Sequence, residues 1–99
     1  MIRQITGKLK LPIDTDKIYI YEKNDFQISR LMILRKEGDD FIYLDNSGIP
    51  YRLDYLVYTD YIVNANKRSM DASLSGYKLY ECDNEKDIDS FKLSKELLK

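Results

Sequence analysis

Histidine is absent from this chain of 99 residues, and cysteine occurs only once. Histidine is the side chain that most often transfers protons near neutral pH and is the commonest zinc ligand. Its absence therefore excludes zinc sites and Ser-His or Cys-His mechanisms within one chain. The lone Cys82 cannot form an internal disulfide, and we interpret it as a small apolar side chain. These features fit the reducing cytoplasm, where we expect the protein to reside.

Glycine and long apolar runs are also scarce. The four glycines are too few and too scattered for a phosphate-binding loop. The longest unbroken aliphatic run is Leu31 to Leu34, and no basic segment leads from Met1 into a long apolar one, so we expect neither a membrane span nor a signal peptide. Sixteen Lys and Arg side chains face 17 Asp and Glu side chains, which argues against a nucleic-acid partner.

The densest apolar and aromatic stretch runs from residue 27 to residue 63, and its first half predicts a hairpin. Residues 28–35 are apolar on both alternating sets, which is typical of a strand that is covered on both sides. Residues 37–40 form a turn in which Gly38 tolerates a positive φ, and residues 41–44 form the second strand. We interpret the pair as the centre of the fold.

A second turn cluster, Asp-Asn-Ser-Gly at residues 45–48, leads into a short third strand at residues 49–53. Pro50 lies at the start of this strand and has no backbone N–H to donate to a ladder. The third strand is therefore expected to lie at an edge of the sheet or to begin at its proline.

The apolar spacing then changes from two to three and four residues, which predicts a single helical turn near residues 53–58. The side chains expected to point inward are Leu53, Leu56 and Val57. Residues 61–63 regain extended character and predict a final strand of this stretch. The small, polar segment 64–75 is the longest expected loop, and loops of this length often carry function.

The flanking segments predict three further strands and one helix, at residues 1–11, 17–22, 76–82 and 84–98. Residues 17–22 alternate isoleucine with tyrosine, which indicates a half-buried strand with an aromatic outer face. Gly7 marks a bend in the first strand. Asp83 or Asn84 is the expected N-cap of the C-terminal helix. We expect residues 1–99 to form a single domain.

This order of elements resembles small barrels of the Src-homology-3 and Tudor kind, over residues 17–63 and without diagnostic residues. The resemblance implies a small antiparallel barrel or a strongly curved sheet. We therefore predict a mainly β, α+β fold with one helical turn near 53–58 and a C-terminal helix near 84–98.

Tyrosine is over-represented, with nine residues. A tyrosine ring buries a large area at low entropic cost and keeps a polar tip, so tyrosine and arginine are enriched in interfaces. The predicted partner-binding residues are Tyr51, Arg52, Tyr55, Tyr58, Tyr61, Lys67 and Arg68. The alternative is that several of these rings simply cover a small core.

A second set of residues suggests a small anionic ligand instead. If the basic side chains converge on the face that carries the tyrosines, they offer stacking and phosphate contacts to a nucleotide. The basic side chains in question are Arg30, Arg35, Lys36, Arg52, Lys67 and Arg68. A small chain often builds such a pocket at a homo-oligomeric contact.

The leading hypothesis is a non-enzymatic, tyrosine-rich protein-binding module without metal or cofactor. Frequent Ile, Lys, Asn and Tyr suggest an AT-rich genome, so we expect a small phage or mobile-element accessory protein. Such a protein would inhibit or occupy a larger host protein, for example a defence component. The alternative is a binder that sequesters a nucleotide or another small anionic signal molecule. Catalysis is a third hypothesis and would rest on a lysine or on the adjacent carboxylates Asp39 and Asp40.

Overall fold

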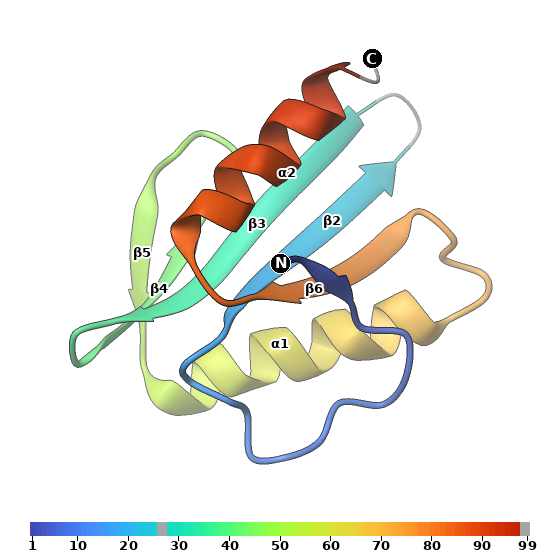
Figure 1. Cartoon of the computed structure of the whole chain (residues 1–99). Coiled ribbons are helices and arrows are strands. Elements are labelled where there is room, and N and C mark those ends of the chain that lie inside the picture. Colours follow the sequence, from blue (N-terminus) through green and yellow to red (C-terminus); the bar gives the residue numbers. More distant parts are fainter. Residues whose placement is uncertain (26–27, 98–99) are drawn as a thin grey trace.

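The computed structural model describes residues 1–25 and 28–97. They form one six-stranded sheet in which every neighbouring pair is antiparallel, in the order β1-β6-β2-β3-β4-β5 (Figure 1). The elements are β1 (Arg3–Gln4), β2 (Ile18–Asp25), β3 (Ile28–Glu37), β4 (Asp40–Leu44), β5 (Pro50–Leu53), α1 (Tyr55–Met70), β6 (Tyr77–Cys82) and α2 (Glu85–Leu97). The predicted α+β class with a mainly antiparallel sheet is confirmed.

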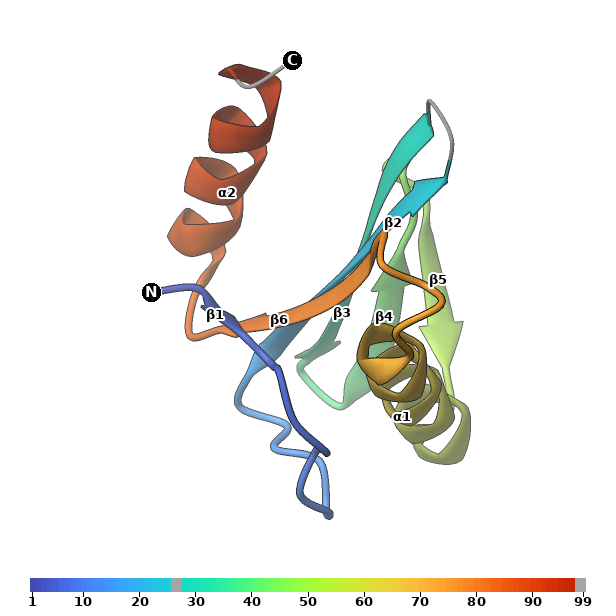
Figure 2. The ribbon, with the colours of Figure 1, turned by 90° about the vertical axis from the view of Figure 1, so that its right-hand side faces the viewer.

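Three layers make up the fold, with the curved sheet between α1 on one face and α2 on the other (Figure 2). Each face carries its own apolar cluster. Strand β2 contributes to both, because Tyr19 and Tyr21 face α1 while Ile18 and Ile20 face the α2 side. The strand predicted at 17–22 is confirmed, but its expected aromatic outer face is wrong because α1 covers these two rings.

The predicted hairpin of β3 and β4 is also confirmed. Strand β3 is buried from both sides, with Met32 and Leu34 in the cluster beneath α1 and Ile33 in the cluster beneath α2. Gly38 takes up the turn with φ of 61°. Strand β5 begins at Pro50 and forms one edge of the sheet, as the missing proline N–H predicts.

Helix α1 is the largest departure from the sequence prediction. One helix of 16 residues, Tyr55–Met70, replaces the predicted single turn, the strand at 61–63 and most of the loop at 64–75. Its N-cap is Asp54, whose side chain accepts a hydrogen bond from Val57 N at 2.9 Å. The residues that it buries are Tyr58, Ile62, Ala65 and Asn66. This stripe follows helical spacing and begins five residues later than expected.

The inward orientation expected for Leu56 is wrong, because 75% of this residue is exposed. Val57 is exposed as well, and Leu53 is partly buried against the cluster beneath α1. Tyr58, which we had assigned to the binding surface, is instead 0% exposed. The helix therefore faces the sheet with the side that carries Tyr58 and Ile62, and Leu56 lies on the opposite side.

At the N-terminus, the strand predicted over residues 1–11 is reduced to the two residues of β1. The chain beyond it is held by the buried Asn66 of α1. Its side chain accepts a hydrogen bond from Leu9 N and donates one to Gly7 O, both at 2.9 Å. These bonds satisfy the local backbone without a ladder, which explains why the segment leaves the sheet near Gly7.

The C-terminal half of the prediction is confirmed in outline. Strand β6 lies between β1 and β2 and places Leu79 beneath α1 and Tyr80 beneath α2. Helix α2 follows, with Asn84 Oδ1 accepting from Asp87 N at 3.2 Å, as expected of an N-cap. Leu98, the last residue of the predicted helix, lies outside the described residues.

Among the described strands, β1 and β5 form the two edges of the sheet and do not pair with each other. The expected barrel and the Src-homology-3-like arrangement are therefore not confirmed. A full helix stands between β5 and β6 instead of a single turn, and it carries the chain back across the sheet. Neither of the two described helices is long and apolar enough to cross a membrane.

A group of charges joins β1, the start of β2 and the end of β6. Asp83 contacts Lys17 Nζ, and its Oδ1 atom lies 3.2 Å from Arg3 Nη2. Hydrogen bonds to Lys17 and then Arg3 lower the pKa of Asp83 from its usual value to about 2. The charged carboxylate is thus favoured in the folded protein, although it remains partly exposed to solvent.

Asp83 is expected to make the protein sensitive to acid. A carboxyl pKa that is lower in the folded state stabilises the protein above the unfolded pKa, and this stabilisation is lost as the pH falls from about 4 to about 2. The Asp83→Asn variant should lose less thermal stability than the wild type over this interval, measured by circular dichroism melts at a series of pH values. Equal losses in the two proteins would contradict the role of this group.

Candidate binding cleft between helix α1 and the sheet

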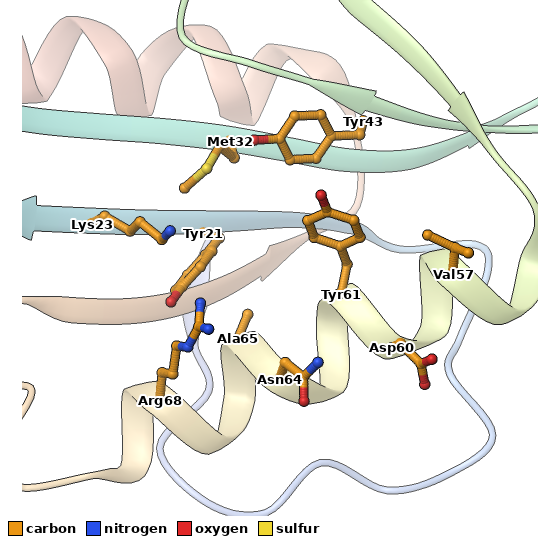
Figure 3. Close-up of a pocket in the computed structure, with 10 residues that line it drawn as sticks. All are labelled: Tyr21, Lys23, Met32, Tyr43, Val57, Asp60, Tyr61, Asn64, Ala65 and Arg68. Atoms are coloured by element: carbon orange, nitrogen blue, oxygen red, sulfur yellow. The ribbon is translucent and has the colours of Figure 1, made fainter.

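An open cleft of about 430 Å³ lies between α1 and strands β2, β3 and β4 (Figure 3). A volume of this size is typical of small-molecule sites, which span roughly 300–1,000 Å³. The cleft is lined by Tyr21, Lys23, Met32, Tyr43, Val57, Asp60, Tyr61, Asn64, Ala65 and Arg68. It therefore combines three tyrosine rings with two cations, one carboxylate and an apolar floor.

Helical spacing explains which side of α1 lines the cleft. Val57, Tyr61 and Arg68 recur at intervals of four and seven residues, so they lie on one flank of the helix, beside the stripe that packs on the sheet. Ala65 lies at the border of the two sets and is buried. Because its side chain is a single methyl group, space remains between α1 and Met32 of β3 (Figure 3).

One end of the cleft is aromatic. The centroid of the Tyr43 ring lies 5.2 Å from that of Tyr61 and 6.0 Å from that of Tyr51, so three rings form a row from α1 across β4 to β5. Burial, followed by the nearby Tyr61, raises the pKa of Tyr43 above its usual value. Its hydroxyl is therefore uncharged at neutral pH and can donate as well as accept a hydrogen bond.

The other end of the cleft is cationic. Lys23 Nζ lies 5.5 Å from the ring centroid of Tyr21 and 5.9 Å from that of Tyr77, within the range of cation–π contacts. Arg68 extends from α1 towards the hydroxyl of Tyr21 (Figure 3). Burial raises the pKa of Tyr21, and the Arg68 guanidinium opposes that rise. Two positive charges from different elements thus meet at Tyr21.

Arg30 does not line the cleft itself, but it adds a third positive charge beside Lys23 at this end. It is the cross-strand partner of Lys23 in the β2–β3 ladder, and strand alternation places it on the same face as Met32. Its side chain is exposed. Within residues 1–25 and 28–97, neither Arg30 nor Arg68 forms an ion pair with a carboxylate.

The structure separates the seven residues that the sequence had grouped as one binding site. Tyr51 and Tyr61 come together through Tyr43, and Arg68 lies at the opposite end of the same cleft. Tyr55 packs on Phe41 at 5.3 Å between ring centroids.

The other three predicted residues do not join them. Tyr58 belongs to the core. Arg52 lies on the opposite face of β5 from Tyr51, and its Nε atom is 3.7 Å from Asp40 Oδ2. Lys67 is exposed outside the cleft lining.

The basic residues considered for an anionic ligand are also divided between the faces. Arg35 contacts Glu85 and Glu37 on the α2 side of the sheet. Arg52 shares that side, whereas Arg30 and Arg68 lie on the side of the cleft. Only part of the expected convergence is therefore observed among the described residues.

The sequence prediction did not include Tyr21, Lys23, Tyr43 or Asn64 among the site residues. These side chains come from strands far apart in the chain and meet only through sheet register and the packing of α1. A signal for α1 itself was present, because Asp54 precedes a stripe at Tyr58, Ile62 and Ala65 with helical spacing. Extending that period would have placed Asn64 on the helix.

The cleft offers uncharged hydroxyl donors, cations and apolar surface, which suit binding. No group of three or more Cys, Asp or Glu side chains that could hold a metal occurs in the described part of the chain. Asp39 and Asp40, the carboxylates considered for catalysis, lie exposed at the β3–β4 turn and do not line the cleft.

No protein-family model, curated protein or solved structure matches this chain.

Proposed function

We propose that this protein is a non-enzymatic binding module that occupies the surface of a larger protein. The observation that carries this proposal is the distribution of exposed apolar side chains. Ten large hydrophobic residues are exposed in the described part of the chain, and six of them come from residues 49–61. We call these six the aromatic surface: Ile49, Tyr51, Tyr55, Leu56, Val57 and Tyr61.

The aromatic surface has the composition of an interface centre. Tyrosine supplies three of its six members, and tyrosine is enriched among the residues that carry most of the binding energy of interfaces. Its members come from the edge strand β5, from Ile49 just before it and from the first half of α1, which contacts β5. Leu56 is its most exposed member and makes a suitable anchor for an apolar pocket on the partner.

The exposed edge of β5 favours a protein partner that pairs with this strand and carries an acidic residue opposite Arg52. Its outer side has no neighbouring strand among the described residues, so an extended segment of another protein can pair with it. Arg52 lies on this strand with an 81% exposed side chain. Two copies pairing here would bring like charges together, whereas a different protein with an acidic residue at this position would be attracted.

The biological setting is part of the same proposal. A single small module with a concentrated contact surface is suited to occupying one site on a larger protein. The AT-rich residue usage supports an origin in a phage or mobile element, and the proposed target is a host protein such as a defence component.

Replacing Leu56 by aspartate is expected to abolish partner capture. The substitution places a charge at the most exposed member of the aromatic surface, and loss of a hot-spot residue typically weakens binding by about 2 kcal/mol or more, roughly 30-fold. Tagged wild-type and Leu56→Asp proteins would be used to capture partners from host lysate, followed by quantitative mass spectrometry. A genuine partner should be enriched by the wild type and strongly depleted in the variant.

Leu93→Asp provides the matched control, because Leu93 is an exposed leucine on α2, on the other side of the sheet. It should retain the same partner. If every protein captured by the wild type is captured equally by Leu56→Asp, or is lost equally with Leu93→Asp, the aromatic surface is not the contact site.

A further inference from the structure

The geometry points to a second ligand: we propose that the cleft beside α1 binds a planar aromatic molecule carrying a phosphate group, of the size of a nucleoside monophosphate. This proposal goes beyond partner binding by the aromatic surface. It rests on the cationic end of the cleft, where Lys23, Arg30 and Arg68 lie outside that surface. The two sites share only Val57 and Tyr61.

The aromatic end fits the ring of such a ligand. Tyr61 and Val57 form one wall, and Met32 with Ala65 forms an apolar floor between α1 and β3 (Figure 3). Base–tyrosine contact tolerates any base because every base has an apolar face. The volume of about 430 Å³ suits a mononucleotide and is too small for an extended strand.

The cationic end fits the phosphate. Arg68 presents a planar fork of N–H donors, which matches phosphate geometry. Arg30 and Lys23 approach from the sheet as cross-strand partners. A phosphate at this point meets Arg30 and Arg68, neither of which forms an ion pair with a carboxylate among the described residues.

The Tyr21 hydroxyl supplies an independent sign of a ligand. Tyr21 is 5% exposed and lines the cleft, and its hydroxyl oxygen has no hydrogen-bond partner of good geometry within the described residues. Buried polar groups normally have a partner. Arg68 can only donate to the Tyr21 oxygen, so the hydroxyl hydrogen of Tyr21 is available to a phosphate oxygen that Arg68 also contacts.

The side chains at the outer rim of the cleft determine which end of the ligand lies beside Arg68. Asp60, Asn64 and Arg68 follow one another at intervals of four residues, so carboxylate, amide and guanidinium lie in a row along α1. Asp60 repels phosphate and accepts from hydroxyl or amino groups, which belong to the nucleoside end. Tyr61 and Arg68 are separated by about 10 Å along the helix axis, a span that a mononucleotide and an arginine side chain bridge together.

The test is a titration of the purified protein with AMP, GMP, CMP and UMP, with the four nucleosides and with inorganic phosphate, followed by NMR and calorimetry. At least one nucleotide should bind saturably and shift the resonances of cleft residues. Its nucleoside and inorganic phosphate should each bind at least about tenfold more weakly, because each lacks one half of the contacts. Failure of all four nucleotides to bind, or equally tight binding of phosphate alone, overturns the proposal.

Arg68→Glu should weaken nucleotide binding roughly 10- to 100-fold, because a charged hydrogen bond to phosphate is replaced by repulsion. Lys86→Glu makes the same change in net charge on exposed α2 and should have no effect. Arg30→Glu, at an exposed strand position, repeats the test should Arg68→Glu fail to fold. Undiminished nucleotide binding by the folded Arg68→Glu or Arg30→Glu protein overturns the proposal. Arg68 lies outside the aromatic surface and Leu56 does not line the cleft, so each proposal can fail alone.

Discussion

The Tyr58→Ala variant is expected to lose about 3–5 kcal/mol of unfolding free energy, the usual cost of deleting a fully buried aromatic ring. Tyr58 is 0% exposed, and its ring centroid lies 4.8 Å from that of Phe41. It also belongs to the cluster that joins α1 to the sheet. Urea denaturation followed by circular dichroism would measure the loss.

Two further variants at these positions separate packing from other effects. Leu56→Ala, at the neighbouring exposed position, should change stability by less than about 0.5 kcal/mol. Tyr58→Phe removes a buried hydroxyl that has no hydrogen-bond partner in the described part of the chain, so it should be at least as stable as the wild type. A Tyr58→Ala protein as stable as Leu56→Ala would show that Tyr58 is not a core residue.

The Gly76→Ala variant is expected to lose about 1–3 kcal/mol or more, as overpacked sites do. An added Cβ at position 76 would lie 2.2 Å from the backbone oxygen of Asn24. A side-chain rotation cannot relieve this contact, because the contacted oxygen belongs to the backbone. The hydrogen bond from Asn24 N to Gly76 O, at 2.8 Å, holds the two backbones together. The variant should therefore show a lower denaturation midpoint, with the junction of β2 and β6 displaced.

Gly7→Ala is the matched control for this close approach. Apart from its two chain neighbours, no described residue has a heavy atom within 4 Å of an added Cβ at Gly7. Alanine also restricts the unfolded chain more than glycine does. This variant should be as stable as the wild type or slightly more stable, by up to about 1 kcal/mol. A Gly76→Ala protein that matched Gly7→Ala in stability would contradict the tight packing of β6 on β2.

The strands were predictable from the sequence because their signals are local. Residues 28–35 are apolar on both alternating sets, and Gly38 and Pro50 mark a turn and an edge. Alternation alone could not reveal that both faces of β2 are covered. That requires knowing that two helices lie on opposite sides of the sheet.

The sequence did not predict helix α1 in full because many of its residues have low intrinsic helix propensity. Its first nine residues include β-branched and aromatic side chains, such as Val57, Tyr61 and Ile62, which have low helix propensity. The packing of Tyr58 and Ile62 on the sheet outweighs that preference. Intrinsic propensity is thus overridden by tertiary contacts at the element that determines where the cleft lies.

Part of the candidate binding region could be predicted and part could not. Of the four tyrosines between Tyr51 and Tyr61, three are exposed and Tyr58 is buried. Tyr21 and Tyr43 join the cleft only through β-sheet register, which a single sequence does not reveal. The opposite orientation of Arg52 follows from side-chain alternation along β5, which separates Arg52 from Tyr51.

The position of β6 has a consequence for synthesis on the ribosome. This strand fills the gap between β1 and β2, yet it is translated more than fifty residues after β2 begins. Until it emerges, the β2–β5 meander exposes an unpaired edge rich in isoleucine and tyrosine, the kind of edge that recruits other nascent chains. The last quarter of the chain therefore protects the first, and premature termination before Tyr77 would release a product prone to aggregation.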